Sequence, residues 1–298
     1  MTTLPPPQRD NTAAVVVAYH PDAEFAARIQ AIAGQVDRVL IVDNGSGADA
    51  RAALEALEKT AAVELLLNDA NLGIATALNQ GCAWAARQSY PWALLFDQDS
   101  VPRPDMLERM GEVFSDYPEH DRLAVIGANH LNPASNLSVD LGHGRSSGDW
   151  VEKEVVITSG SLLALSAYAA LGPFRDDFFI DEVDHEYCLR ARIADYAVIM
   201  TIAPLLEHSL GKVETRHFLG RDVHPSFHAP FRWYYMTRNH AVVLREYLGR
   251  APGWVLNSTL DHLKMAFKVL LFEDRKREKF AYAWRGLRDA MRGKMGKL

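Results

Sequence analysis

The sequence lacks the features that mark a secreted, disulfide-bonded or membrane-spanning protein. It has only two cysteines, Cys82 and Cys188, among 298 residues, too few for a disulfide framework and without zinc-site spacing. It has no run of about 18 apolar residues that would cross a bilayer, and its start lacks the charged-then-apolar pattern of a signal peptide. We therefore expect a protein of the cytoplasm.

An excess of positive charge is also missing, since the net charge is −6 at pH 7. This argues against a general nucleic-acid-binding protein. The charge is uneven, however: residues 272–298 carry nine basic and four acidic side chains, a net +5 that leaves −11 for the rest. Aromatic residues interleave with this basic tail, a pattern that fits peripheral contact with an anionic membrane. Packing on the protein's own domain or on a second subunit, as in a homodimer, fits it equally well.

The chain does contain a regular alternation of short apolar runs and amphipathic stretches. Five apolar runs predict buried strands: 13–19, 38–42, 63–67, 92–96 and 123–128. Helix-like stretches lie between them, so we expect an α/β fold with a mostly parallel central sheet and helices on both faces. Two long helical stretches, about 231–250 and 254–293, close the chain.

These patterns divide the chain into three parts. Residues 1–12 are rich in proline and predict a mobile leader. Residues 13–250 form the main α/β domain, and residues 251–298 form a helical, basic C-terminal tail.

The most informative stretch is Trp92–Val101, where an apolar strand ends in two carboxylates, Asp97 and Asp99. Carboxylates at the end of a buried strand are costly unless a cation meets them. Mg²⁺ or Mn²⁺ carrying a phosphorylated ligand is such a cation, because these ions bind carboxylates together with phosphate oxygens. An Asp pair that caps the next helix is the alternative.

Polar residues also follow other predicted strands, at the sheet edge where ligands bind in α/β folds. Tyr19 follows the first strand, and Asp43 and Asn44 follow the second. Asp43 can accept a hydrogen bond from a nucleoside base or ribose, although an ordinary Asx-Gly turn is the alternative. Asn71 and Gly73 open a helix, whose N-terminus favours phosphate.

Residues 178–190 form the densest acidic and aromatic stretch. On a helix, Asp181, Asp184 and His185 share one face by their spacing. An inward-facing carboxylate near apolar rings can have a raised pKa and act as a general base. The alternative is that Asp181 caps the helix, an interpretation that fits Asp184 less well.

Later residues give weaker signals. His208 is a candidate metal ligand, although a lone histidine is more often structural. Arg232 and Arg238 lie among aromatic residues on a predicted helix, which suits phosphate and sugar recognition, or else docking of an aromatic face on the core. Three more histidines lie in a predicted loop, as ordinary loop residues or substrate contacts: His217, His224 and His228.

Together these motifs resemble the inverting GT-A glycosyltransferases of family 2 and, within them, the bacterial rhamnosyltransferases. The resemblance covers roughly residues 13–245. It rests on the order of five motifs: Val-Val-Val-Ala-Tyr-His-Pro (15–21), Asp-Asn-Gly-Ser (43–46), Asn-Leu-Gly-Ile-Ala-Thr-Ala-Leu-Asn-Gln-Gly (71–81), Asp-Gln-Asp-Ser (97–100) and Phe-Phe-Ile-Asp to Cys-Leu-Arg (178–190). His-Ser-Leu-Gly (208–211) and Arg-x-x-Tyr-x-x-Arg-Asn (232–239) also resemble the rhamnosyltransferase branch.

The resemblance implies a GT-A fold and a role for each motif. The nucleotide-sugar site would comprise Tyr19, Asp43, Asn44, Asn71, Gly73, Asp97, Arg232 and Arg238. Mg²⁺ or Mn²⁺ would be held by Asp97, Asp99 and His208. Asp184 occupies the position of the catalytic base and Asp181 is the runner-up, while Val183 stands where the broader family often carries glutamate.

The implied reaction moves L-rhamnose from dTDP-β-L-rhamnose, with inversion, to a hydroxyl of a cell-surface polysaccharide or lipid-linked glycan such as O-antigen. A UDP-hexose donor remains open within the same family. Outside it, residues 97–101 also fit the nucleophile motif of haloacid-dehalogenase-type phosphatases, and a non-catalytic nucleotide-sugar-binding subunit is a third reading. The phosphatase leaves the Asp43 and Asn71 motifs unexplained, and the intact carboxylates argue against a mere binding subunit.

Overall fold

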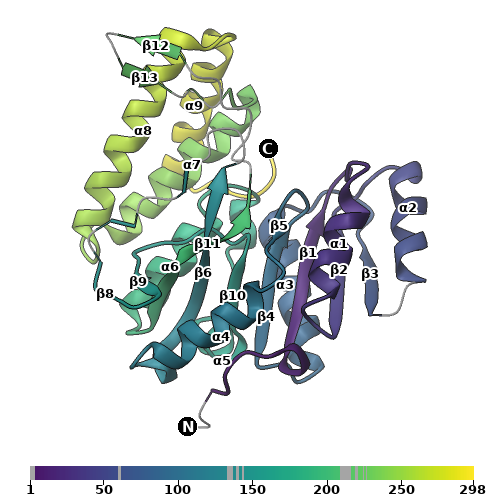
Figure 1. The fold of residues 1–298 in the computed structure, drawn as a ribbon. Coiled ribbons are helices and arrows are strands. Elements are labelled where there is room, and N and C mark those ends of the chain that lie inside the picture. The colour runs from purple at the N-terminus through teal and green to yellow at the C-terminus, as the bar shows by residue number, and fades with distance from the viewer. Residues whose placement is uncertain are drawn as a thin grey trace.

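The structure is a computed structural model that describes residues 4–59, 62–132, 137–138, 141–142, 144–208, 216–218, 221–223, 225 and 227–298. Its centre is one large sheet with the strand order β3-β2-β1-β4-β10-β6-β11-β9-β8, against which helices pack (Figure 1). The first strands are β1 (Thr12–Ala18), β2 (Arg38–Asp43), β3 (Val63–Leu67), β4 (Trp92–Asp97) and β5 (Val101–Pro102). The middle strands are β6 (Leu123–Asn132), β7 (Leu137–Ser138), β8 (Ser146–Ser147), β9 (Trp150–Glu152) and β10 (Ser161–Ala164). The last are β11 (Ala197–Glu207) and a separate hairpin of β12 (Arg216–Phe218) and β13 (Arg221–Val223).

The helices follow the expected alternation in the first half of the chain. They are α1 (Phe25–Ala33), α2 (Ala48–Glu58), α3 (Ile74–Arg87), α4 (Met106–Asp116) and α5 (Leu165–Leu171). The second half adds α6 (Val183–Ile193), α7 (Pro230–Tyr247), α8 (Pro252–Phe272) and α9 (Lys276–Met291). The long predicted stretch 254–293 is therefore two helices, separated where Arg275 adopts a left-handed backbone with φ of 49°.

The first four strands form the parallel half of the sheet, because each apolar run is followed by a crossover helix. All seven residues of β1 are buried. Ala18 pairs with Asp43 on one side of β1, and Val17 pairs with Asp97 on the other. This register brings the two predicted strand-end aspartates to the same edge of the sheet, one on each flank of β1.

The other half of the sheet is mixed, which the sequence did not predict. β10 runs antiparallel to both β4 and β6, although β6 and β11 are parallel to each other. The short strand β5 pairs with the end of β11, so that Val101 lies opposite Glu207. This pairing folds the turn after β4 onto the residue that follows β11.

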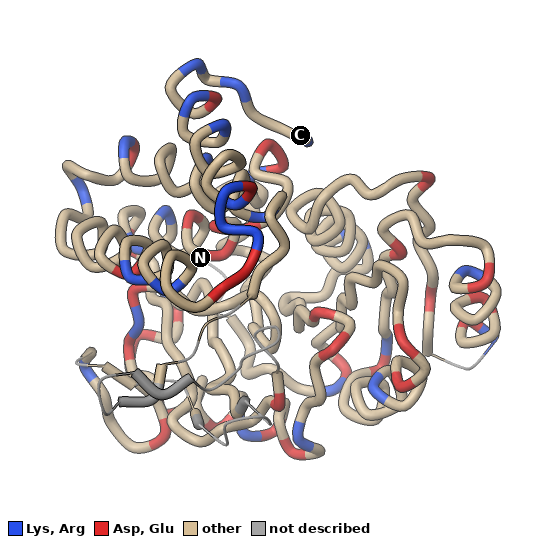
Figure 2. Tube along the Cα trace, turned by 90° about the horizontal axis from the view of Figure 1, so that it is seen from above, with Lys and Arg blue, Asp and Glu red and all other residues tan. Residues whose placement is uncertain are grey.

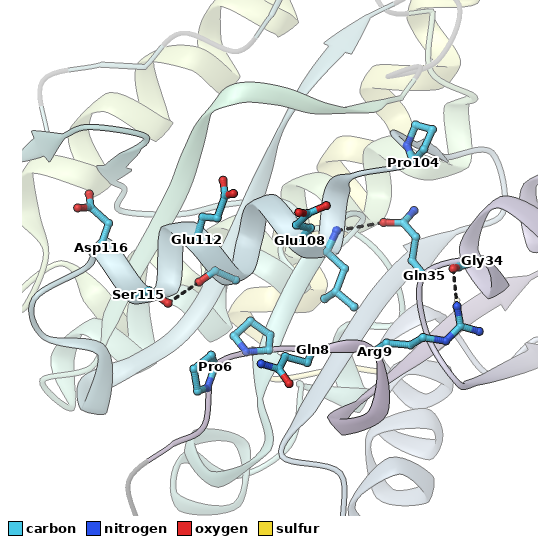
Figure 3. A pocket seen from close by; sticks show the side chains of 13 residues that line it. Pro6, Gln8, Arg9, Gly34, Gln35, Pro104, Glu108, Glu112, Ser115 and Asp116 are labelled. Carbon is cyan, nitrogen blue, oxygen red and sulfur yellow. Dashed lines mark hydrogen bonds between the residues drawn. The ribbon is translucent and has the colours of Figure 1, made fainter.

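The N-terminal segment, for which we predicted a mobile leader, is held against the domain from residue 4 onward. Prolines carry no N–H donor, but their carbonyls accept hydrogen bonds. Trp92 Nε1 donates to the Pro5 carbonyl at 2.8 Å, and Asn11 Nδ2 donates to the Pro6 carbonyl at 2.8 Å. A cavity of about 890 Å³ lies between this segment and α4 (Figure 3), and none of the predicted site residues lines it.

The basic C-terminal tail packs on its own chain. α9 lies along α7, and a Cβ added at Gly286 would come within 2.3 Å of the Tyr234 carbonyl oxygen. Lys279 and Glu273 form a buried ion pair at 2.6 Å. Of the three arrangements that the sequence left open for this tail, packing on the same domain is thus present. Within the described ranges, no helix has the length and apolarity needed to span a membrane.

Candidate active site

Nine of the twelve residues predicted for the site line one cavity of about 610 Å³ at the carboxyl ends of β1 and β4. They come from segments far apart in the chain: Tyr19, Asn44, Asn71, Gly73, Asp97, Asp99, Asp181, Asp184 and Arg232. Asp43, His208 and Arg238 do not line it. The parallel register collects these loops at one edge of the sheet, as the strand-end rule predicts, and this cavity is the candidate site.

Two asparagines build one wall of the cavity. Asn44 Nδ2 donates to Asn71 Oδ1 at 3.2 Å and to the Gly73 carbonyl at 3.1 Å. Asn71 Oδ1 also accepts from the Gly73 backbone N–H at 2.9 Å. Gly73 has φ of +91°, and a Cβ there would lie 2.6 Å from the Phe179 carbonyl oxygen. Only glycine fits this close approach of the two backbones, and buried Gly73 lines the cavity just before α3.

Asp43 supports this wall from behind. Its side chain is completely buried and accepts hydrogen bonds from the backbone N–H and the hydroxyl of Ser46. Arg51 Nε lies 3.6 Å from Asp43 Oδ2. Tyr19, in contrast, is 44% exposed, and its backbone N–H donates to Gln98 Oε1 at 2.7 Å. The exposed Tyr19 ring is therefore free to contact a ligand, whereas Asp43 fixes the turn.

The acidic pair and His208 form a candidate metal centre. Ligand atoms of Asp97, Asp99 and His208 all lie within 4.8 Å of one another, and His208 Nδ1 is 3.5 Å from Asp99 Oδ1. Ser100 Oγ lies 2.9 Å from the same nitrogen, because the β5–β11 pairing brings the two turns together. Two carboxylates and one imidazole are a donor set that Mn²⁺ accepts readily and Mg²⁺ less so, so the residues present fit such an ion.

Burial makes it costly to keep the side chains of this centre charged. It raises the pKa of Asp97 to about 6, since desolvation disfavours the charged carboxylate and the neighbouring His208 only partly opposes this effect. Burial also lowers the pKa of His130, whose ring lies 5.9 Å from that of His208, to about 4. His130 is therefore neutral at pH 7 and adds no charge to the centre.

The opposite wall carries the two candidate bases at the start of α6. Asp181 is ion-paired with Arg232 of α7. Asp184 accepts a hydrogen bond from the backbone N–H of His185 at 2.9 Å. Asp181 and Glu182 both have left-handed backbones, with φ of 66° and 63°, a strain that proteins keep mainly at functional sites.

Arg238 holds this strained loop from below. It is fully buried and donates to the carbonyls of Asp177 at 3.1 Å and Phe178 at 2.9 Å. Asn239 Nδ2 donates to three carbonyls of the same loop, those of Phe178, Ile180 and Asp181. The structure thus places Arg238, which we predicted to bind the nucleotide sugar, outside the cavity.

A cluster around Glu182 was not predicted from the sequence. Its buried carboxylate lies 3.0 Å from His185 Nδ1 and 2.9 Å from His240 Nδ1, and His262 Nε2 is 3.7 Å away. The three histidines come from α6, α7 and α8, so no local spacing announces the cluster. Of the predicted loop histidines, His228 is half-buried, His217 is described by its backbone alone, and His224 lies outside the described residues.

A second cavity, of about 750 Å³, adjoins the first. Both are lined by Glu182, His185, His262 and Met265. The second extends along α8, past Asn257 and Asp261. The two cavities are therefore adjacent parts of one cleft, with these four side chains at their boundary and Asp184 lining only the first.

Comparison of the sequence with known proteins found a matching family and a similar relative. Residues 13–134 match the family described as glycosyl transferase family 2. The dTDP-rhamnosyl transferase RfbF of Shigella flexneri is 26% identical over 253 residues, which are 79% of this chain and 80% of that protein.

Two solved structures share the fold. S. aureus TarS 1–349 has a TM-score of 0.58 at 13% identity, covering 94% of this chain and 80% of that chain. The mannosyltransferase PcManGT from Pyrobaculum calidifontis, in complex with GDP-Man and Mn²⁺, has a TM-score of 0.56 at 14% identity, covering 99% and 91%. Residues 13–134 are therefore similar to the glycosyl transferase family 2 domain, and the chain as a whole shares the α/β fold of these two solved structures.

Proposed function

We propose that this protein transfers L-rhamnose from dTDP-β-L-rhamnose to a hydroxyl of a cell-surface polysaccharide or lipid-linked glycan, in the cytoplasm at the inner face of the cell membrane. The observation that carries the proposal is that one cavity is lined by Asn44, Asn71, both aspartates of the acidic pair and Asp184. The relative named dTDP-rhamnosyl transferase supports the donor. A UDP-hexose donor is the alternative for the same cavity.

We assign the nucleoside to the wall formed by Tyr19, Asn44 and Asn71. Gly73 lines the cavity beside this wall, and Arg232 offers a guanidinium to the phosphates of the donor. Asp97, Asp99 and His208 would hold Mg²⁺ or Mn²⁺, which when bound neutralises charge on the leaving diphosphate.

We assign the general base to Asp184 and keep Asp181 as the runner-up. The ion pair with Arg232 occupies the Asp181 carboxylate, so an acceptor hydroxyl has less access to Asp181 than to Asp184. Asp184 removes the proton from the acceptor hydroxyl as the oxygen bonds to the anomeric carbon. The bond from that carbon to the diphosphate oxygen breaks in the same displacement, which inverts the anomeric centre.

We assign the acceptor to the second cavity, because it joins the first beside His185. An acceptor that extends along α8 would present its reacting hydroxyl toward Asp184. The polar side chains of Asn257 and Asp261 on this path suit the hydroxyl groups of a glycan.

A thermal-shift panel tests the donor site. The protein is melted with Mn²⁺ and dTDP, UDP, GDP or ADP, because a ligand that binds only the folded state raises the melting temperature. We expect a Mn²⁺-dependent shift that is largest with dTDP and is lost in Asp99→Asn. A larger shift with UDP would change the donor, and no shift with any nucleotide would refute the transferase site and favour the phosphatase.

A further inference from the structure

The outer face of α8 is an uncovered apolar stripe within the described part of the chain. Five large side chains recur at intervals of three or four residues and are 45–61% exposed: Leu256, Leu260, Leu263, Phe267 and Leu270. This spacing places them on one side of the helix. Soluble proteins rarely leave so many large apolar side chains contiguous and open to water, so the stripe indicates an interaction surface.

The inner face of the same helix belongs to the cleft. Trp254 and Val269 are buried, and His262 and Met265 line the cavity that Asp184 also lines. Figure 1 shows α8 at the edge of the C-terminal helices, beside α7 and away from the sheet. The two faces of α8 therefore differ: one lines the cleft, and the opposite one carries the apolar stripe.

The charge around the stripe decides what covers it. Residues 252–298 carry eleven basic and five acidic side chains, so this part is +6 while the rest of the chain is −12. Lys264 and Lys268 lie on α8 itself, where exposed Lys264 also pairs with Asp261 at 2.8 Å, and Figure 2 shows further Lys and Arg along the C-terminal helices. A second copy docked face to face would oppose like charges, whereas an anionic lipid surface is complementary.

We propose that α8 docks in the plane of an anionic membrane, with the stripe of Leu256, Leu260, Leu263, Phe267 and Leu270 inserted at the headgroup boundary. Lys264 and Lys268 then contact lipid phosphates, and the helix lies on the bilayer without crossing it. The docking holds the open cleft against the surface from which a lipid-linked acceptor extends. Only this last consequence rests on the proposed function, because the docking itself requires no nucleotide sugar.

Vesicle sedimentation of the full chain tests the docking without any donor. We compare phosphatidylcholine vesicles with and without phosphatidylglycerol, and the wild type with a Leu263→Glu, Phe267→Glu double variant. The expected result is binding that requires phosphatidylglycerol and falls about tenfold or more in the double variant. Leu248→Glu is the matched control, because Leu248 is also 61% exposed but lies at the end of α7, outside the stripe.

Two further measurements make the outcome decisive. Lys264→Glu with Lys268→Glu should weaken binding to phosphatidylglycerol vesicles, and light scattering should show the same oligomeric state for all variants. Equal vesicle binding by the wild type and the stripe variant, binding without anionic lipid, or an oligomer that the stripe variant dissociates would each overturn the proposal. The nucleotide thermal shift, measured on the same variants, should stay unchanged, so failure of the docking and failure of the donor site are distinguishable.

Discussion

Arg232 and Asp181 form an ion pair across the cleft wall, from α7 to the loop before α6. The pair distinguishes the two candidate bases, because Arg232 balances the charge of Asp181, whereas Asp184 has no arginine partner among the described contacts. We therefore predict that Asp184→Asn lowers turnover by about 10²- to 10⁴-fold, the usual size of general-base catalysis. Asp181→Asn should cost much less turnover.

The check is release of dTDP from dTDP-rhamnose, with the thermal shift by dTDP as the binding control. Asp184→Asn should keep the thermal shift, because the carboxylate acts on the acceptor and not on the nucleotide. A larger loss of turnover in Asp181→Asn than in Asp184→Asn would reverse the assignment.

The two arginines of α7 should respond differently to replacement by lysine. Arg238→Lys removes part of a buried fork that serves the Asp177 and Phe178 carbonyls. Losing hydrogen bonds from this buried charged donor costs about 1–3 kcal/mol of unfolding free energy, although Asn239 and the Gly296 N–H still serve these carbonyls. Arg232→Lys should leave stability nearly unchanged but weaken the thermal shift by dTDP, because its side chain faces the cavity. Urea unfolding and the nucleotide shift, measured on both variants, test this contrast; equal effects of the two on nucleotide binding would contradict it.

The two arginines also show where prediction from sequence ends. Arginine among aromatic rings suits both phosphate binding and core packing, and the sequence contains both cases on one helix. Arg238 lies 5.2 Å from the Tyr234 ring centre and is buried beneath the loop at Asp177. Only the tertiary fold, which brings that loop over α7, separates the two roles.

The strand ends were predictable for a physical reason. Asp43 and Asp97 each end an apolar run, and a parallel register necessarily aligns such ends. The Glu182 cluster was not predictable, because its histidines meet through helix packing and share no local spacing. The antiparallel entry of β10 was missed for a similar reason, since four apolar residues carry no signal of strand direction.

Gly73 should be irreplaceable for backbone reasons. Gly73→Ala forces a side chain into φ of +91° and against the Phe179 carbonyl, at a cost of about 1–3 kcal/mol. We expect a lower melting temperature and a weaker dTDP shift, since the Asn44 contact to the Gly73 carbonyl would move as well. Gly249→Ala is the control, because a Cβ there meets nothing within 4 Å. A Gly73→Ala protein as stable as the control would show that the loop adapts.

His208 should govern metal affinity. His208→Ala removes the one imidazole from the three-residue centre, so the Mn²⁺ concentration that gives half of the maximal thermal shift with dTDP should rise about tenfold or more. His120→Ala, at a turn away from the cavity, should leave that concentration unchanged. An unaltered Mn²⁺ requirement in His208→Ala would remove His208 from the ligand set.

The Glu182 cluster should give stability a distinct pH profile. Burial opposes the charge of Glu182, but His185 and His240 outweigh it and hold the pKa of that carboxyl far below its usual 4.5. Burial likewise opposes the charge of His185, but Asp184 and Glu182 raise its pKa from 6.5 to about 9. Each shift adds stability in the state where both groups are charged.

The directions of these two pKa shifts define the pH range in which the cluster adds stability. The Glu182 contribution is present above pH 4.5 and is lost as the pH falls below it, because its folded pKa is depressed. The His185 contribution is complete below pH 6.5 and is lost as the pH rises toward 9, because its folded pKa is raised. Stability from this cluster should therefore be greatest between pH 4.5 and 6.5. Urea unfolding at a series of pH values should show both limbs in the wild type and flatter limbs in Glu182→Gln. Glu24→Gln replaces an exposed carboxylate that pairs with Arg28 and should keep the wild-type profile. A Glu182→Gln profile that matches it would show that the histidines do not depend on this carboxylate.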